Sequence, residues 1–303
     1  MTVYLETRIH RYVGLSSDTK PADESLPGSL FYETDTRNWF VWNGAAWTSY
    51  SYPYSLETAR SNFIAQVLDV MGDVRRFWLP SSDETTTAAD QTRNQATLTH
   101  NATVATRLHR LGLGYYVDYD GSTNYSTFPD ADDLSFGNAS ADEAFSVVML
   151  VNITNTANNR TLFGKYTTNQ REYRAYLATN DTLQFALYDE SSDGAENLSS
   201  NAAITQDDWI LLVLTYDGSE DSDGMKIYVD GLPIAVTATS EVGATYTAME
   251  NGTSVLAIGS GTGAASLPFQ GGIAAFALGG AELTADQVWQ LRNLFDGYFD
   301  FLG

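Results

Sequence analysis

Short stretches of alternating apolar and polar residues, bounded by Asn, Asp or Gly, follow one another from about residue 76 to the end of the chain. They include "REYRAYLAT", "TLQFALYDE" and "GMKIYVDGLPIAVTAT", and the mostly apolar "WILLVLTYDG" lies among them. A period of two is typical of half-buried strands, and turn signals at regular spacing are typical of a β-sandwich. "AFSVVMLVNI" is nearly all apolar, which predicts a strand buried on both faces. The pattern therefore predicts a mostly β domain over residues 76–303.

A much smaller set of strands precedes this domain. "GSLFYETDTRNWFVWNGAAW", residues 28–47, predicts a three-stranded meander with strands at Leu30–Glu33, at Asn38–Trp42 and through Trp47. Asn43-Gly44 tolerates positive φ and is a strong hairpin signal. "RYVGL" predicts a further short strand ahead of the meander.

Both faces of this small sheet carry aromatic residues, and a sheet of this size cannot bury two apolar faces alone. Two compatible roles follow for these residues. They form a miniature core around Tyr32, Trp42 and Trp47, or one face docks on another protein. The docking candidates are Tyr32, Trp39, Phe40, Trp42 and Trp47.

Apolar residues at helical spacing predict two helices. The first covers residues 55–73, with Phe63, Val67 and Val70 on one side, Ser55 as N-cap and Gly72 as the stop. The second is "LTADQVWQLRNLF", with an N-cap, a capping-box residue and an apolar face at Thr284, Gln287, Val288, Leu291 and Leu294. We therefore expect three parts: a small β attachment module over 1–54, a connecting helix and linker over 55–75, and the β domain over 76–303.

Charge and composition exclude several classes of partner and chemistry. The chain has 38 acidic and 16 basic residues, a formal net charge of −22, and it would repel phosphate backbones, so we expect no nucleic-acid partner. No apolar run reaches the ~18 residues of a membrane span, so we expect no membrane insertion. "MTVYLETRIHRYVGL" lacks the apolar core of a signal peptide. The chain contains no cysteine, which excludes disulfides and thiolate chemistry.

The order of the strands carries a resemblance to a known fold. "DDWILLVLTYDG" followed by "KIYVDGLPIA", then "SVLAIGS", "FQGGIAAFAL" and the capped helix at "LTADQV", resembles the laminin-G type of concanavalin A-like jelly roll. "YYVDYDGSTNYSTFP" is similar to the opening strand pair of that family. The resemblance covers about 76–303 and implies a two-sheet jelly-roll sandwich in which Trp209 is a core residue. It leaves the function open, because this fold hosts lectins, hydrolases and structural modules.

The N-terminal stretch "GLSSDTKPADESLPGSLFYETDTRNWFVWNGAAW" resembles a short module of tailed-bacteriophage virion proteins. The resemblance implies a structural virion protein that docks by this module and displays the jelly roll. Such a protein would be a capsid decoration protein, a head fibre or part of the tail surface. Its partners would be other virion proteins, its place the virion surface, and a homo-oligomer is compatible with this role.

Residues for catalysis are sparse. His10, His100 and His109 lack the spacing of a helical metal site, and we expect structural or surface roles for them. No Gly-x-Ser-x-Gly elbow supplies a serine nucleophile. A glycosidase needs two facing carboxylates, and Glu172 lacks the acidic partner in step that jelly-roll hydrolases carry on one strand. We therefore expect a protein without enzymatic activity.

The resemblance also implies a calcium site, from which this chain departs. The expected loop is "DQTRN", Asp90–Asn94, with Arg93 at a glycine position, and Ala274 replaces a later aspartate. Loss of a carboxylate and gain of a guanidinium both oppose a divalent cation, so we expect no metal and no other cofactor. The acidic segment 216–224 lacks regular ligand spacing and predicts a solvated loop.

Glycan binding requires exposed aromatic rings beside polar groups. Tyr125, Tyr166, Tyr188 and Tyr246 are the candidates, and each is equally compatible with packing at an edge of the sandwich. The main interpretation is a non-enzymatic structural virion protein of a tailed bacteriophage. The alternatives are a carbohydrate-binding adhesin, which attaches to a host-surface glycan, and a glycan hydrolase.

Overall fold

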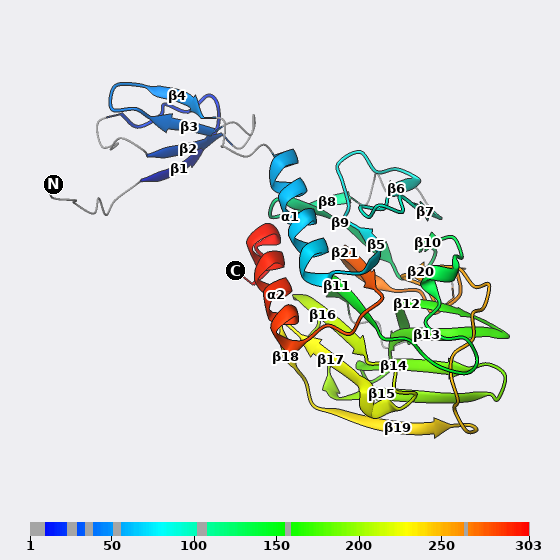
Figure 1. Ribbon diagram of the computed structural model, residues 1–303. Helices are drawn as coiled ribbons and strands as arrows, with labels where there is room; N and C mark the ends of the chain where they lie inside the picture. The colour runs from blue at the N-terminus through cyan, green and yellow to red at the C-terminus, as the bar shows by residue number, and fades with distance from the viewer. Residues whose placement is uncertain are drawn as a thin grey trace. The chain divides into compact units, whose positions relative to one another are not determined.

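The computed structural model describes residues 10–22, 29–33, 39–50, 56–101, 108–154, 159–263 and 266–302. The chain divides into two compact units, Met1–Ser61 and Asn62–Gly303 (Figure 1). The division lies inside the first helix, which the sequence assigns to the connecting segment.

The N-terminal unit contains a four-stranded sheet in the order β1-β2-β3-β4. β1 (Arg11–Gly14) is parallel to β2 (Leu30–Glu33), and β2, β3 (Trp39–Trp42) and β4 (Trp47–Tyr50) form an antiparallel meander. The predicted meander and the strand ahead of it are confirmed, although Asn38 lies outside the described residues. The prediction that the last strand ends at Trp47 is wrong: the strand begins there, because the Asn43 side chain caps the preceding turn at 2.9 Å from two backbone N–H groups.

One face of this sheet is a miniature aromatic core. The rings of Phe31 and Trp47 have centroids 6.0 Å apart, and those of Trp42 and Trp47 are 5.6 Å apart. Phe40 is in register with Phe31, and the Lys20 ammonium lies 4.3 Å from its ring centroid. Three of the five proposed docking residues, Phe40, Trp42 and Trp47, therefore share the face that forms this core.

Tyr32 points to the opposite face, because β2 buries Phe31 and Glu33 on its inner side. The prediction of a miniature core that includes Tyr32 is wrong for this residue, because Phe31 occupies the core position instead. Trp39 lies in register with Tyr32, and only its backbone is described. The docking role of these aromatic residues stays a prediction.

The C-terminal unit is a sandwich of two sheets, as predicted. The first has the order β19-β15-β14-β13-β12-β20-β10-β7-β6 among the described residues. Its strands are β6 (Thr87–Ala89), β7 (Thr97–His100), β10 (Ser126–Phe128), β12 (Arg160–Thr167), β13 (Gln170–Leu177), β14 (Thr182–Asp189), β15 (Gly194–Ala203), β19 (Val236–Val242) and β20 (Leu256–Ile258). We call it the nine-stranded sheet.

The second sheet has the order β18-β17-β16-β11-β21-β9-β8 among the described residues, with β5 paired to β21 as its eighth strand, and we call it the eight-stranded sheet. Its strands are β5 (Val74–Trp78), β8 (Leu108–Leu111), β9 (Gly114–Asp120), β11 (Phe145–Ile153), β16 (Trp209–Tyr216), β17 (Met225–Val229), β18 (Leu232–Pro233) and β21 (Gln270–Gly279). The central strand β11 lies between β16 and β21, and every residue in it except Asn152 is buried. The predicted strand with two buried faces is therefore confirmed.

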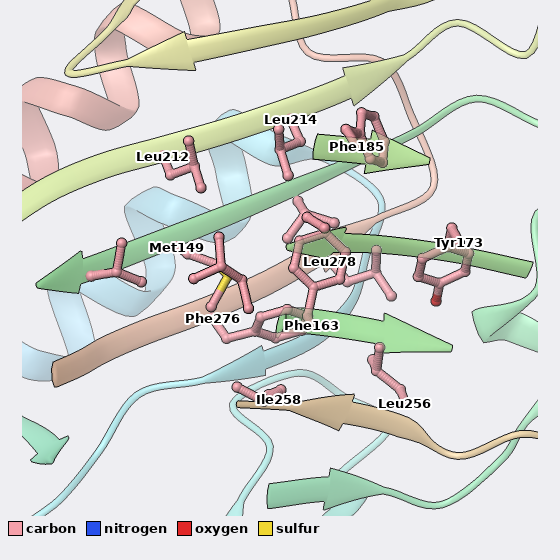
Figure 2. Close-up of a cluster of buried hydrophobic side chains, with 14 of the residues drawn as sticks. Met149, Phe163, Tyr173, Phe185, Leu212, Leu214, Leu256, Ile258, Phe276 and Leu278 are labelled. Carbon is pink, nitrogen blue, oxygen red and sulfur yellow. The ribbon is translucent and has the colours of Figure 1, made fainter. Parts of the chain in front are cut away.

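The apolar core lies between the two sheets. Figure 2 shows Met149, Leu212 and Phe276 of the eight-stranded sheet facing Phe163 and Phe185 of the nine-stranded sheet. Burial of this many large side chains is the main source of stability for the unit.

Helix α1 (Leu56–Met71) buries Phe63 and Val67, as predicted, whereas Val70 is half-buried and Met71 takes the inner position. Gly72 ends the helix with a φ of +75°, as expected of a C-terminal glycine. The proposed N-cap Ser55 lies outside the described residues.

Helix α2 (Ala285–Phe299) begins with the predicted capping box between Thr284 and Gln287. Val288 and Leu291 are buried as predicted, while Leu294 is half-buried and Phe295 is buried in its place. No helix in the described parts of the chain is long and apolar enough to cross a membrane.

The two helices pack together against the eight-stranded sheet (Figure 1). Phe63 stacks on Tyr298 with centroids 4.4 Å apart and contacts Phe77 of β5 at 6.4 Å. Gln287 Nε2 donates to the carbonyl of Val70 at 2.7 Å, which ties α2 to α1. From residue 62 onward, the helix expected as a connector is therefore part of the sandwich unit.

Trp209 is not a core residue, which corrects the expectation from the family resemblance. β16 points Ile210, Leu212 and Leu214 inward, so Trp209 lies on the outer side of its sheet and is half-buried. Its ring packs edge-on against Tyr116, with centroids 4.8 Å apart.

Candidate functional site

A shallow hollow of about 610 Å³ lies on the outer side of the nine-stranded sheet, over β13, β14, β15 and β19. Alternation along β14 creates it: Leu183, Phe185 and Leu187 point into the core, so Thr182 and Gln184 point outward. Among the described residues, neither an acidic nor a basic side chain lines the hollow. The lining residues are Asn159, Tyr176, Ala178, Asn180, Thr182, Gln184, Ser199, Ser200, Asn201 and Thr237.

Hydrogen bonds across the strands hold these side chains in place. Gln184 Nε2 donates to Ser199 Oγ at 2.6 Å and to Thr182 Oγ1 at 3.0 Å. Thr237 Oγ1 donates to Asn201 Oδ1 at 2.7 Å. Within the described residues, Gln184 Oε1 and Asn201 Nδ2 are left without a protein partner. The hollow therefore presents fixed amide donors and acceptors, which suit ligands rich in hydroxyl groups.

Beside the hollow, three tyrosine rings surround the guanidinium of Arg174. Its Cζ lies 4.4 Å from the ring centroids of Tyr166 and Tyr176 and 5.5 Å from that of Tyr188. Arg174 Nε donates to Tyr188 Oη at 2.7 Å. Burial raises the pKa of Tyr188 to about 12, so this hydroxyl is neutral at pH 7. Tyr176 belongs to both the cluster and the hollow, and we call the combined surface the polar face.

The four tyrosines proposed from the sequence separate in the structure. Tyr166 and Tyr188 lie together on the polar face, where Tyr166 is half-buried and Tyr188 is only 7% exposed. Tyr125 is half-buried just ahead of β10, where its N–H donates to Asn101 Oδ1 at 2.7 Å. In the sheet order β10 is separated from β13 by β20 and β12. Tyr125 is therefore not part of the polar face.

Tyr246 is a buried structural residue. Tyr246 and Tyr216 both donate hydrogen bonds to Asp142 Oδ2, at 2.6 Å and 2.8 Å, and the N–H of Met249 donates to Asp142 Oδ1 at 2.8 Å. Burial raises the pKa of Asp142, and burial together with the Asp142 carboxyl raises the pKa of both tyrosines. Tyr246 is only 7% exposed, so its ring is not available to stack on a sugar.

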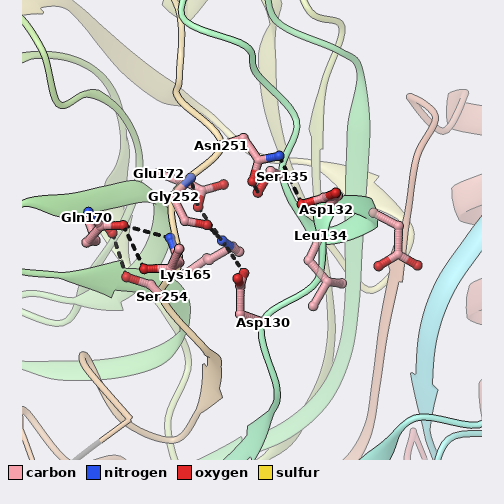
Figure 3. A network of polar contacts seen from close by, with 12 residues as sticks. Asp130, Asp132, Leu134, Ser135, Lys165, Gln170, Glu172, Asn251, Gly252 and Ser254 are labelled. Atoms are coloured by element: carbon pink, nitrogen blue, oxygen red, sulfur yellow. Dashed lines mark hydrogen bonds and ion pairs between the residues drawn. The ribbon is translucent and has the colours of Figure 1, made fainter.

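Glu172, the carboxylate weighed as a catalytic candidate, forms a buried ion pair with Lys165, and both side chains are fully buried (Figure 3). The pair arises from a β-bulge: Lys165 pairs with Tyr173 and Tyr166 with Arg171, which leaves Glu172 as the extra residue. A bulge re-aims the side chain of the extra residue, and here it turns Glu172 toward Lys165.

The ion pair and its neighbours hold the loop that contains Gly252 and Ser254, more than 75 residues further along the chain. Lys165 Nζ donates to the carbonyl of Gly252 at 2.7 Å and lies 2.9 Å from Asp130 Oδ1. The N–H of Gly252 donates to Glu172 Oε1 at 3.1 Å, and Ser254 Oγ donates to the carbonyl of Gln170 at 2.7 Å. Burial raises the pKa of Glu172 to about 7, even though Lys165 acts in the opposite direction. These contacts give the pair a structural role.

His100, Ser126 and Glu84 lie in one buried group. His100 Nδ1 is 2.7 Å from Ser126 Oγ, and His100 Nε2 is 3.6 Å from Glu84 Oε2. Ser126 Oγ is also 2.6 Å from Tyr119 Oη. All three side chains are buried, and Ser126 is only 1% exposed. The group resembles a nucleophilic triad in composition, yet a substrate has no path to Ser126, so we assign it to packing.

The residues at the family's calcium position do not suit a divalent cation. Asp90 Oδ1 accepts the N–H groups of Phe77 and Thr92 at 2.9 Å and 3.0 Å, and Asp90 Oδ2 accepts Thr92 Oγ1 at 2.7 Å. The carboxylate is thus used within its own loop, and Ala274 offers no ligand atom from its side chain. Independence from calcium stays a prediction.

Sequence reasoning missed Arg174, Tyr176, Gln184 and Asn201. Aromatic residues in loops were the expected glycan-binding residues, whereas these four side chains belong to strands β13, β14 and β15. The signal was present in "YRAYL" and "TLQFAL", where alternation assigns Arg174, Tyr176 and Gln184 to the face opposite the core.

Residues 120–289 match a protein-family model described as the concanavalin A-like lectin/glucanases superfamily. No curated protein matches the chain. The match begins beyond the N-terminal unit, so it does not bear on the resemblance of that unit to a phage module.

Several solved structures share the fold. The binding domain of Paraclostridial Mosquitocidal Protein 1 is 14% identical with a TM-score of 0.55, over 75% of this chain and 53% of that chain. The botulinum neurotoxin serotype D ligand-binding domain, in complex with N-acetylneuraminic acid, is 12% identical with a TM-score of 0.51. The match covers 75% of this chain and 52% of that chain. Trypanosoma rangeli sialidase, in complex with sialic acid, is 13% identical with a TM-score of 0.53. The match covers 89% of this chain and 44% of that chain. The chain spans about half the length of these structures.

Proposed function

Because the chain belongs to the concanavalin A-like lectin/glucanases superfamily, we propose that it is a carbohydrate-binding protein and that the polar face is its binding surface. The observation that carries this proposal is the hollow of about 610 Å³ lined by amides, hydroxyls and the Tyr176 ring. Two structural relatives, the serotype D domain and the sialidase, are described in complex with a sugar. This supports glycan binding here by analogy of fold.

The chemistry of the face fits this role. A half-buried tyrosine ring offers an apolar surface to the C–H face of a sugar, while Gln184 Oε1 and Asn201 Nδ2 offer one acceptor and one donor to its hydroxyls. Because the side chains are already held by hydrogen bonds, little conformational entropy is lost when a ligand binds.

A glycan array followed by titration calorimetry tests the proposal. Tyr176→Ala and the double variant Gln184→Ala/Asn201→Ala should each weaken binding of an array-positive glycan by at least about tenfold, the equivalent of 1.4 kcal/mol. Tyr125→Ala changes a tyrosine elsewhere on the same sheet and should leave the affinity unchanged. Loss of binding in Tyr125→Ala alone would move the site to the other end of the sheet.

We propose binding without turnover. Glu172 is held by Lys165, and within the described residues the hollow itself is lined by no carboxylate. An inverting or retaining glycosidase needs two such groups. Release of new reducing ends from a bound polysaccharide would instead support the hydrolase alternative.

We further propose that the N-terminal unit attaches the protein to a larger assembly, as its resemblance to a phage virion module implies. Supporting this, Met1–Ser61 is a separate compact unit with its own aromatic core. The chain would then act in a virion-surface adhesin and hold a host glycan on its polar face. Its partners would be other virion proteins, and the same arrangement is compatible with a homo-oligomer.

A further inference from the structure

The position of Arg174 on the polar face is fixed by residues of two neighbouring strands. It lies directly opposite Gly164 of β12 in the register of the sheet. A Cβ added at Gly164 would come within 2.9 Å of Arg174 Cβ, so the glycine gives the arginine side chain room. The arginine then lies between the rings of Tyr166 and Tyr176, each 4.4 Å from its Cζ.

The rings of Tyr166 and Tyr176 pack against the guanidinium, and only its Nε has a hydrogen-bond partner among the described residues. Arg174 Nε is used by Tyr188 Oη. The two terminal nitrogens, Nη1 and Nη2, carry four N–H donors and have no acceptor among the described residues. Tyr166 and Tyr176 contact the guanidinium through their rings and accept no hydrogen bond from these donors.

Unlike several other arginines of the sandwich unit, Arg174 has no carboxylate partner among the described residues. On the same strand, Arg171 is paired with Glu190 and Asp193, at 2.5 Å each. Arg76 makes a bidentate pair with Asp133, with both distances 2.9 Å. Arg174 makes no ion pair within the described residues, although the chain has 38 acidic side chains. An arginine fork held open in this way fits a planar carboxylate that comes from outside the chain.

We propose that Arg174 binds the carboxylate of an acidic sugar, so that the polar face selects glycans containing uronic or nonulosonic acid residues. This rests on the proposed function, because the rest of the sugar occupies the adjoining hollow through Tyr176. The net charge of −22 opposes an anionic ligand at long range. At physiological ionic strength that repulsion is screened over about 8 Å, whereas the contact with Arg174 is direct.

The test compares acidic oligosaccharides with their own neutral forms. The probes are 3′-sialyllactose and tetragalacturonic acid, each as the free acid and as the methyl ester, with a sulfated lactose as the third anionic probe. At least one free acid should bind at least about tenfold more tightly than its methyl ester. Sulfated lactose should bind more weakly than the acid, because a planar carboxylate matches the fork.

Variants at Arg174 make the test specific. Arg174→Gln should abolish the preference for acid over ester while the ester still binds, and Arg174→Lys should keep only part of the preference, because it keeps the charge without the fork. Arg110→Gln is the matched control. Arg110 is an exposed arginine that lies 5.2 Å from the Tyr115 ring on the opposite sheet, and its loss should not change the preference.

The outcomes separate this inference from the function on which it rests. Equal binding of acid and ester, a preference that survives Arg174→Gln, or binding of neutral glycans alone would overturn the role of Arg174 and leave glycan binding intact. Tighter binding of sulfated lactose would overturn the assignment to carboxylates. A failure of every acidic and neutral glycan to bind would overturn the proposed function itself.

Discussion

At the residue scale, the protonation of Glu172 makes a pH-dependent contribution to stability. Burial raises its pKa from 4.5 to about 7. A raised pKa means that the folded protein binds this proton more tightly than the unfolded chain does. The contribution is therefore fully present below pH 4.5 and is lost as the pH rises through about 7. Its slope is at most about 1.4 kcal/mol per pH unit, the value of one proton per molecule.

Glu172→Gln should remove this contribution while the amide still accepts a hydrogen bond from Lys165. We expect the free energy of unfolding of the variant, relative to the wild type, to increase between about pH 5 and 7 and to level off above that range. Urea unfolding at several pH values measures this difference. Glu143→Gln, at an exposed position, controls for the loss of one negative charge. A difference that is the same at all pH values would contradict the raised pKa.

At the element scale, the register of β16 decides the role of Trp209. The side chain is half-buried and packs against Tyr116 on the outer side of the sheet, 4.8 Å between centroids. Trp209→Ala should therefore cost about 1–2 kcal/mol, the loss of one aromatic pair and part of its buried area. Phe276→Ala, in the inner core, should cost about 3–5 kcal/mol. Denaturant unfolding of both variants compares them, and equal costs would show that Trp209 belongs to the core.

The same scale shows how much could be predicted from sequence. Alternation and turn residues are local signals, so the β11 strand, the Thr284 capping box and the Gly72 helix end were all predictable. The bulge at Glu172 was not, because it depends on pairing with a strand that only the folded sheet brings alongside. Arg174 was missed for a related reason: its ring partners come from β12, β13 and β14, and the chain order does not show that they meet.

At the scale of the whole molecule, the two compact units support a division of labour between attachment and glycan binding. The N-terminal sheet completes its own aromatic core, and the polar face lies wholly within residues 62–303. Removal of residues 1–54 should therefore abolish binding to phage particles that lack the protein, while glycan affinity stays within about twofold of the full chain. Co-sedimentation with such particles measures the first effect and calorimetry the second.

The co-sedimentation result and the glycan affinity of the truncated chain test different parts of this division of labour. If the truncated chain still co-sediments, attachment belongs to the sandwich unit, and the resemblance of residues 14–47 to a virion module does not reflect its role. If the truncated chain loses its glycan affinity, the N-terminal sheet contributes to the binding surface. Tyr32→Ser in the full chain refines the first case, since it changes the face opposite the Phe31–Trp42–Trp47 core and leaves that core in place. Loss of co-sedimentation in Tyr32→Ser, with glycan affinity unchanged, would place docking on that face.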